Sequence, residues 1–221
     1  MTFSSEWDLR YSEHTHLSVW PWSDVVSYFH RHAKPFSPNT KVLEIGFGAG
    51  ANIPFFKTIN INYSGIEGSK AIYAQVIKKY PELFNNLFLG DFLCYEFPEK
   101  YDVIIDRASM THNSTTAIKN GLRHLASNLN KGGRYIGIDW FSTEHSDFSM
   151  GETIDQFTKT DVPTGQFTGV GKIHFSSKEH IEDIFEKSGF NLTRLEHKKI
   201  DTEIPNVKHK FASWNLVAEL K

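Results

Sequence analysis

The chain has 221 residues, with 24 basic and 26 acidic side chains and a net charge of -2; this length fits one α/β domain with appendages, and the balanced charge argues against a nucleic-acid partner. It contains no apolar run of roughly 18 residues and no basic-then-apolar leader, which argues against a membrane span or a secretory signal and favours a cytoplasmic protein. Cys94 is the only cysteine, so an intrachain disulfide and a cysteine-built zinc site are excluded; the histidines near the N-terminus lack the carboxylate support and defined spacing of a metal site, so no metal is expected.

Residues 1–39 are predicted to form an N-terminal helical cap ahead of the first strand. Ser23 and the apolar positions that follow it indicate a short helix that ends before Pro35. This stretch is rich in aromatic side chains, among them Trp20 and Trp22. Their functional interpretation is the wall of a substrate pocket, and the structural alternative is packing at the edge of the core.

Residues 41–52, KVLEIGFGAGAN, predict a strand, a tight turn and the start of a helix. Gly46, Gly48 and Gly50 permit positive φ angles and allow backbone amides to approach a ligand closely. The helix that begins after Asn52 presents unpaired N–H groups to the same place. The turn is therefore predicted to hold a small molecule. Because the Lys and Ser/Thr of a P-loop do not follow these glycines, an NTPase is disfavoured.

Strand and helix patterns alternate along the rest of the chain. Further strands are predicted at 63–67, 87–89, 101–105 and 134–140, and an antiparallel pair at 190–200 and 211–220. Helices are predicted from Ser69, over 118–129 up to the Gly132-Gly133 turn, and from a capping box at Ser176 and Glu179 to Gly189. Residues 141–175 are too long for an ordinary connection and are predicted to form a lid or substrate loop, with a disordered insertion as the alternative.

This alternation predicts a Rossmann-like α/β fold in a single domain over 1–221: a seven-stranded sheet, mostly parallel with an antiparallel C-terminal hairpin, and helices on both faces. Ligands of such sheets bind at the carboxyl ends of the strands. Glu44, Glu67, Asp91 and Asp106 lie at or near strand ends and are predicted to surround one pocket. Four acids favour a ligand with hydroxyls, amines or positive charge and would repel a polyphosphate.

Two ligands remain compatible with the glycine turn itself. Gly46, Gly48 and Ala51 satisfy the relaxed dinucleotide fingerprint, and Glu67 follows about twenty residues later, as expected for a ribose-binding acid. An NAD-dependent oxidoreductase is therefore the alternative enzyme. Glu44 within the strand, the third glycine, the later acids and the antiparallel pair favour a methyl donor instead.

The motif VLEIGFGAG and the reversed terminal strands resemble those of class I S-adenosylmethionine-dependent methyltransferases of the small-molecule type, and the resemblance runs from the glycine motif to the last strand. It implies that the three glycines pass under the methionine part of the cofactor and that Glu67 bonds both ribose hydroxyls. It also implies a set of further cofactor contacts along the chain. These are Trp7, Arg10, Tyr11, Glu44, Asn52, Gly68, Ser69, Asp91, Phe92, Asp106, Arg107 and Ala108.

The predicted function is methyl transfer from S-adenosylmethionine to an O or N nucleophile of a small-molecule acceptor, leaving S-adenosylhomocysteine. The main task is to align nucleophile, methyl carbon and sulfur for in-line displacement, and a general base is needed only for a hydroxyl or a protonated amine. His112 is the candidate base, with hydrogen bonding inside its own loop as the structural alternative. The candidate substrate contacts are Trp20, Trp22, Asp139, Trp140, His145 and His174.

A non-catalytic methyltransferase-like binding module is the alternative from another class. Neither a nucleic-acid nor a membrane partner is expected, and the sequence carries no signal of oligomeric state.

Overall fold

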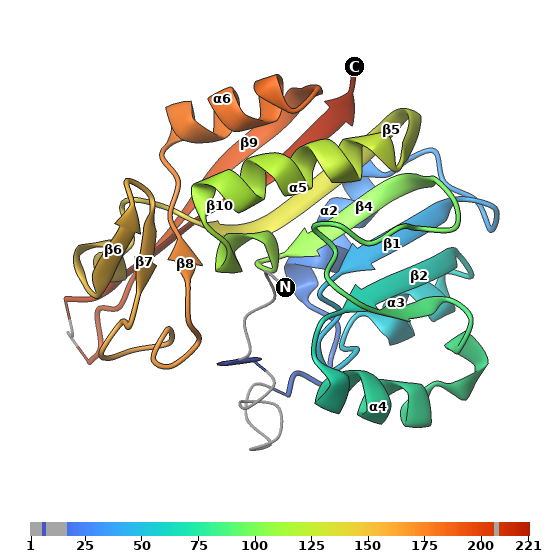
Figure 1. Cartoon of the computed structure of the whole chain (residues 1–221), viewed down its shortest axis with the longest axis horizontal. Helices are drawn as coiled ribbons and strands as arrows, with labels where there is room; N and C mark the ends of the chain where they lie inside the picture. The colour runs from blue at the N-terminus through green and yellow to red at the C-terminus, as the bar shows by residue number, and fades with distance from the viewer. Residues whose placement is uncertain (1–5, 8–16, 206–207) are drawn as a thin grey trace.

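The structure is a computed structural model that describes residues 6–7, 17–205 and 208–221. Its centre is a seven-stranded sheet with the strand order β3-β2-β1-β4-β5-β10-β9 (Figure 1). The parallel strands are β1 (Lys41–Ile45), β2 (Asn62–Glu67), β3 (Leu87–Leu89), β4 (Tyr101–Arg107) and β5 (Leu129–Phe141). The final hairpin, β9 (Phe190–Asp201) and β10 (Lys210–Leu220), joins the sheet antiparallel to β5. The predicted fold class is confirmed.

Helices cover both faces of this sheet, because its central strands bury side chains on both sides. On one face, α2 (Ser23–His32), α3 (Ile53–Thr58) and α4 (Lys70–Lys79) share a core with the sheet. On the other face, α5 (Thr115–Ser127) and α6 (Lys178–Lys187) pack over a second core. Figure 1 shows α5 and α6 in front of the sheet and α2 behind it.

Two helices begin with serine caps. Ser69 caps α4 as predicted, and its hydroxyl oxygen accepts the Ile72 N–H at 3.3 Å. The cap of α6 is Ser177, which accepts the His180 N–H at 3.2 Å, so the capping box predicted at Ser176 is one residue too early. Ser176 and Ser177 are both chemically suited to cap a helix, and only the backbone conformation decides which of them caps α6.

The boundary between α5 and β5 also differs from the prediction. The helix ends at Ser127, and Leu129 already pairs with Tyr101 as the first residue of β5. Leu129 is buried, and its spacing of four from Leu125 continues the helical pattern. A buried residue at the start of a strand cannot be told from the last apolar position of a helix by spacing alone.

A second, smaller sheet forms where a long loop was predicted. It contains β6 (Glu152–Asp155), β7 (Thr158–Thr160) and β8 (Ile173–His174) in antiparallel order, and it lies beyond β10 in Figure 1. A short 3₁₀ helix, η3 (Ser146–Ser149), precedes it. Its own apolar core includes Phe141, Phe167 and Phe175. Strands this short carry no recognisable alternation, which is why the sequence pattern did not reveal them.

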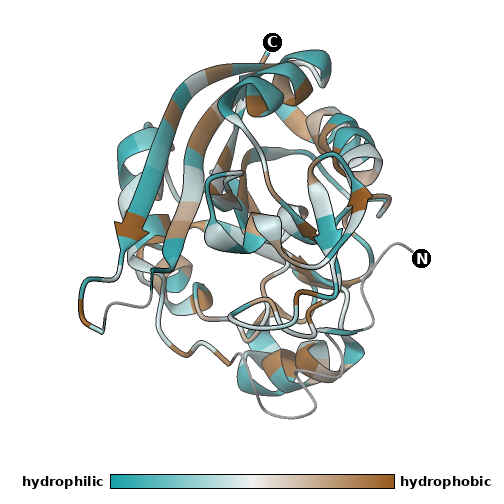
Figure 2. Ribbon diagram, turned by 90° about the vertical axis from the view of Figure 1, so that its left-hand side faces the viewer, coloured by the Kyte–Doolittle hydropathy of each residue, from teal (hydrophilic) through white to brown (hydrophobic). Residues whose placement is uncertain are grey.

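Strand β9 forms one edge of the main sheet. Figure 2 shows it as mostly hydrophilic beside the more apolar β10. The charged side chains of Arg194, Lys198 and Lys199 lie along it, and charges on an edge strand oppose edge-to-edge association with other chains. Among the described residues, no helix is both long enough and apolar enough to cross a membrane.

Candidate active site

A cavity of about 400 Å³ opens at the carboxyl ends of the parallel strands. This is the edge where sheets of this type bind ligands. Its walls come from the turn after β1, the loops after β2, β3 and β4, the end of β5, and the segment around the small sheet. The lining residues are Trp7, Ser18, Trp22, Glu44, Gly46, Phe47, Gly48, Ala49, Ala51, Asn52, Glu67, Gly68, Gly90, Asp91, Phe92, Arg107, Ala108, Ser109, His112, Asn113, Asp139, Phe141, Gln166, Phe167, Val170 and Phe211.

The glycine turn forms one side of this cavity. Gly46, Gly48 and Gly50 have φ angles of 64°, 52° and 73°, a region that side chains rarely adopt. A Cβ on Gly46 would overlap the Ser109 hydroxyl, so the turn packs directly against the loop after β4. Gly46 and Gly48 line the cavity, whereas Gly50 lies behind the turn, where a Cβ would be 3.0 Å from Ile53 Cδ1. Gly50 therefore shapes the turn without lining the cavity.

Glu67 fastens the end of β2 to the glycine turn. Its Oε2 accepts the Gly48 N–H and its Oε1 accepts the Ser69 N–H, both at 2.9 Å. An ionised carboxylate accepts about four hydrogen bonds, so these two are compatible with additional ligand hydroxyls. Gly68 also lines the cavity. Ser69, predicted as a cofactor contact, is fully buried outside the lining and caps α4 instead.

Glu44 lies at the floor of the cavity. Its carboxylate accepts hydrogen bonds from Asn52 Nδ2 and from the Tyr63 hydroxyl, each at 2.7 Å. Burial raises the pKa of Glu44 to about 7, and the charge of Glu67 acts in the same direction. Asn52 also accepts the Trp22 N–H at 3.0 Å, which ties the N-terminal segment to the turn. The negative charge at this floor therefore changes near neutral pH.

Asp106 lies outside the cavity lining, contrary to the prediction of four acids around one pocket. It pairs in register with Ile45 of β1, so its side chain points to the apolar face that carries Ile45 and Ile104. Its carboxylate is fully buried. It accepts hydrogen bonds from four donors: the Ser109 and Met110 N–H groups, the Tyr135 hydroxyl and Trp140 Nε1.

The hydrogen bonds of Asp106 thus hold the loop after β4 from the face of the sheet that carries Ile45 and Ile104. Its neighbour Arg107 lines the cavity. Trp140, a predicted substrate contact, is fully buried with Asp106 and does not line the cavity. Trp20, another predicted substrate contact, is 82% exposed and lies outside the cavity lining.

A group of charged and aromatic side chains forms a second part of the cavity wall. Arg107 Nη2 lies 3.1 Å from Asp139 Oδ2, and the Arg107 guanidinium lies 3.5 Å from the centre of the Trp22 ring. Lys198 Nζ lies 2.6 Å from Asp139 Oδ1. Burial lowers the pKa of Arg107, and the neighbouring charge of Asp139 opposes that shift. Trp22 and Asp139, both predicted substrate contacts, lie in this wall.

His112 lines the cavity from the short helix η2 (Met110–His112) after β4. Its Nδ1 lies 3.2 Å from the Lys172 carbonyl oxygen. Because a carbonyl only accepts, Nδ1 carries the proton of the neutral imidazole, and Nε2 is the basic nitrogen. The Trp7 ring meets His112 edge-on, with ring centres 4.9 Å apart. His112 therefore combines a fixed tautomer with access to the cavity.

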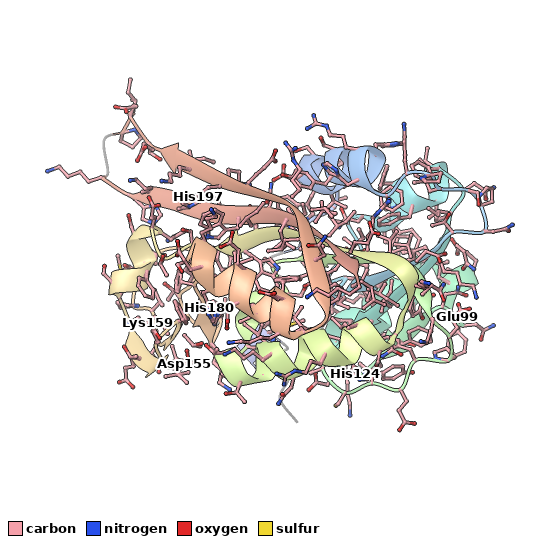
Figure 3. The ribbon with its side chains drawn as sticks, turned by 90° about the horizontal axis from the view of Figure 1, so that it is seen from above. Glu99, His124, Asp155, Lys159, His180 and His197 are labelled. Carbon is pink, nitrogen blue, oxygen red and sulfur yellow. The ribbon has the colours of Figure 1, made fainter. Side chains whose placement is uncertain are left out.

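The two other candidate histidines, His145 and His174, are buried outside the lining. His174 Nδ1 lies 3.0 Å from the Thr158 hydroxyl and its Nε2 lies 3.2 Å from His180 Nε2. Burial lowers the pKa of His174 to about 3 and that of His145 to about 4. Figure 3 shows His180 on α6 at the same end of the molecule as Asp155, opposite the end that carries His124 and Glu99.

Trp7 lines the cavity, and so do the predicted Asp91, Phe92 and Ala108. Arg10 and Tyr11 lie outside the described residues. The sequence predicted a lid or substrate loop at residues 141–175, here called the inserted segment, but did not identify which of its side chains line the cavity. They are the apolar Phe141, Phe167 and Val170 and the polar Gln166, joined by Phe211 from β10. Their only signal in the sequence was the abundance of Phe between 141 and 175.

Comparison with known proteins identifies the family of this chain. A family model described as "Methyltransferase domain" matches residues 11–195. Among curated proteins, an uncharacterized methyltransferase of Bacillus cytotoxicus is 27% identical over 161 residues, which cover 71% of this chain and 73% of the relative.

Two solved structures are similar to this fold. The CcbJ methyltransferase from Streptomyces caelestis has a TM-score of 0.67 and 14% identity, over 100% of this chain and 98% of that one. CalS10, an amino pentose methyltransferase from Micromonospora echinaspora solved with S-adenosylmethionine, has a TM-score of 0.60 and 17% identity, over 90% and 89% of the two chains. At these identities the likeness shows the fold. The family match spans most of the chain and excludes the alternative of an NAD-dependent oxidoreductase. This chain therefore belongs to the methyltransferase-domain family and is a class I S-adenosylmethionine-dependent methyltransferase.

Proposed function

We propose that this methyltransferase transfers the methyl group to an oxygen or nitrogen atom of a small-molecule acceptor. The proposal rests on one cavity of about 400 Å³ whose lining includes the glycine turn, Glu67, His112 and the Arg107–Asp139 pair. This volume lies within the range of about 300 to 1,000 Å³ typical of small-molecule sites.

The residues on the glycine-turn side fit S-adenosylmethionine. When bound, that cofactor supplies a methyl group on a positively charged sulfur. Glu67 and Asp91 offer carboxylate oxygens to hydroxyl and amino groups, and the half-buried Phe92 offers a ring face for an adenine. Gly46 and Gly48 leave the backbone open at the place where side chains would obstruct a ligand. This donor set suits a ligand with hydroxyls, an amine and a positive charge.

His112 is the proposed general base. With Nδ1 donating to the Lys172 carbonyl, Nε2 would take the proton from a hydroxyl or a protonated amine of the acceptor. Phe141, Phe167 and Val170 belong to the apolar core of the inserted segment and line the cavity. They would exclude water from the nucleophile, which keeps hydrolysis from competing with methyl transfer.

The class of acceptor is inferred from the Arg107–Asp139 pair in the cavity wall and from a structurally similar methyltransferase. Arg107 and Asp139 offer one positive and one negative group within an otherwise aromatic wall, as suits a polar metabolite. The structurally similar CalS10 is described as an amino pentose methyltransferase, which supports an acceptor of similar size. The net charge of -2 gives no support for a nucleic-acid acceptor.

Methyl-labelled S-adenosylmethionine and fractionated metabolite extracts test this proposal. We expect label to enter a small molecule, with one S-adenosylhomocysteine formed for each methyl transferred. His112→Gln is the matched variant and should bind the cofactor while transferring methyl groups more slowly. Label recovered in protein or nucleic acid, or no transfer by a wild-type protein that binds the cofactor, would contradict the proposal.

A further inference from the structure

Three polar side chains from two distant parts of the chain meet behind the cavity wall. His145 and Asp147 lie at the start of η3, and His209 lies just before β10. One ligand atom from each of these residues lies within 4.8 Å of the other two. His145 and Asp147 are buried, and His209 is half-buried.

The distances within this cluster approach those of a metal site. His209 Nε2 lies 2.9 Å from Asp147 Oδ1, and His145 Nδ1 lies 3.9 Å from the same oxygen. Around a tetrahedral zinc ion with bonds of about 2.0 to 2.2 Å, neighbouring ligand atoms are about 3.3 Å apart. Modest side-chain rotations would therefore bring the three ligand atoms to one ion.

The second carboxylate oxygen of Asp147 supports a cation or donor beside this residue. Asp147 is 1% exposed, and its Oδ2 accepts no hydrogen bond from the described residues. A buried carboxylate oxygen without a partner destabilises the fold unless a cation or a donor compensates it. Gly165 lies beside this oxygen, and a Cβ there would crowd it at 3.3 Å, so only a glycine leaves this approach open.

Ring nitrogens of both histidines can offer lone pairs to a metal. His145 Nδ1 accepts the Asp147 N–H at 3.1 Å and therefore carries a lone pair, which a bound metal would take in place of that hydrogen bond. His209 Nε2 faces the Asp147 carboxylate and becomes a ligand when its ring proton resides on Nδ1.

We propose that His145, Asp147 and His209 bind one divalent transition-metal ion, with Zn²⁺ as the best match. Two imidazoles and one carboxylate are a donor set that zinc accepts, whereas Ca²⁺ takes six to eight oxygen ligands and Mg²⁺ keeps a nearly octahedral oxygen shell. A surface hollow lined by Ser146, His209 and Lys210 reaches the cluster at His209.

The ion would have a structural role. The His145 ring packs against Phe167 and Phe141, with ring centres 5.2 and 6.2 Å apart, and both phenylalanines line the cavity. Gln166, another lining residue, reaches His145 Nε2 at 3.4 Å. Metal binding would thus fasten the loop between β9 and β10 to the wall of the cavity without touching the acceptor.

Zinc titration of chelator-treated protein by calorimetry tests the site. Wild-type protein should bind one Zn²⁺ per chain. His209→Gln removes one of the three ligands and should weaken zinc binding at least about 100-fold. Losing a residue that only hydrogen-bonds a ligand already lowers metal affinity by about 10- to 100-fold. His32→Gln, which removes a similarly half-buried histidine from the remote helix α2, should leave the affinity unchanged.

Cobalt substitution gives a second measurement that is independent of the variants. Co²⁺ in the wild-type protein should show the strong visible absorption of a four-coordinate site, and Zn²⁺ should displace it. Absence of zinc binding to the wild type, a cobalt spectrum of the hydrated ion, or equal zinc affinity in a folded His209→Gln variant would each overturn the proposal. None of these readouts depends on methyl transfer.

Discussion

Replacing Glu44 with glutamine tests the electrostatics of the cavity floor. The Glu44 side chain is 3% exposed and accepts hydrogen bonds from Asn52 and Tyr63. Burial raises its pKa from 4.5 to about 7, in spite of these two hydrogen bonds, and the charge of Glu67 adds to the rise. The folded protein therefore retains the Glu44 proton over a pH range in which the unfolded chain has released it.

This difference fixes the sign of the pH dependence. The stabilising contribution of the protonated group is fully present below pH 4.5 and is lost as the pH rises through about 7. A rise in pKa from 4.5 to about 7 corresponds to about 3 kcal/mol, at about 1.4 kcal/mol per pH unit. Because glutamine does not titrate, the free energy of unfolding of Glu44→Gln relative to wild type should increase by about this amount as the pH rises.

Urea unfolding between pH 4.5 and 8, followed by tryptophan fluorescence, measures this difference. The buried His145 and His174 have lowered pKa values and make stability fall as the pH drops below 6.5, but their contribution cancels when the two proteins are subtracted at each pH. The exposed Glu152→Gln is the matched control for exchanging a carboxylate for an amide. A flat difference for Glu44→Gln would refute the reasoning.

Three further outcomes follow from the site. Gly46→Ala should destabilise the fold by about 1 to 3 kcal/mol in urea unfolding, because it combines a positive φ with overlap on Ser109, and Ser109→Gly should recover part of that loss. His112→Gln should lower the methyl-transfer rate about 100-fold or more while calorimetry finds cofactor affinity unchanged; an unaltered rate would remove His112 as the base. Trp140→Phe should cost about 1 to 3 kcal/mol of stability through the lost hydrogen bond to Asp106, and a changed acceptor KM without a change in stability would contradict its place in the core.

Much of the fold could be predicted because its parallel strands contain short apolar runs and alternate with amphipathic helices. The edge that holds the cavity followed from the same pattern, since the carboxyl ends of parallel strands meet there. What strand ends do not reveal is the face on which each side chain lies. Glu67 and Arg107 point to the cavity side, whereas Asp106 shares the opposite face with Ile45 and Ile104. Counting in steps of two along β4 from Ile104 would have placed Asp106 correctly.

The inserted segment shows a different limit of the sequence. His145 and His174 were chosen as substrate contacts because they flank a long polar stretch, yet both are buried. The His145 ring packs against Phe167 and Phe175, and the His174 ring packs against Phe157 and His180. These neighbours come together only when the small sheet forms. Neighbours so far apart in the sequence, in strands of two to four residues, leave no local period to detect.

The central claim is that the cavity beside the glycine turn holds S-adenosylmethionine, and calorimetry tests it most directly. Folded wild-type protein should bind S-adenosylmethionine and S-adenosylhomocysteine at one site per chain. Glu67→Ala should weaken both by about 2 to 3 kcal/mol, because it removes a charged acceptor from the cavity wall. Absence of binding by folded wild-type protein, or equal affinity in a folded Glu67→Ala variant, would contradict the account.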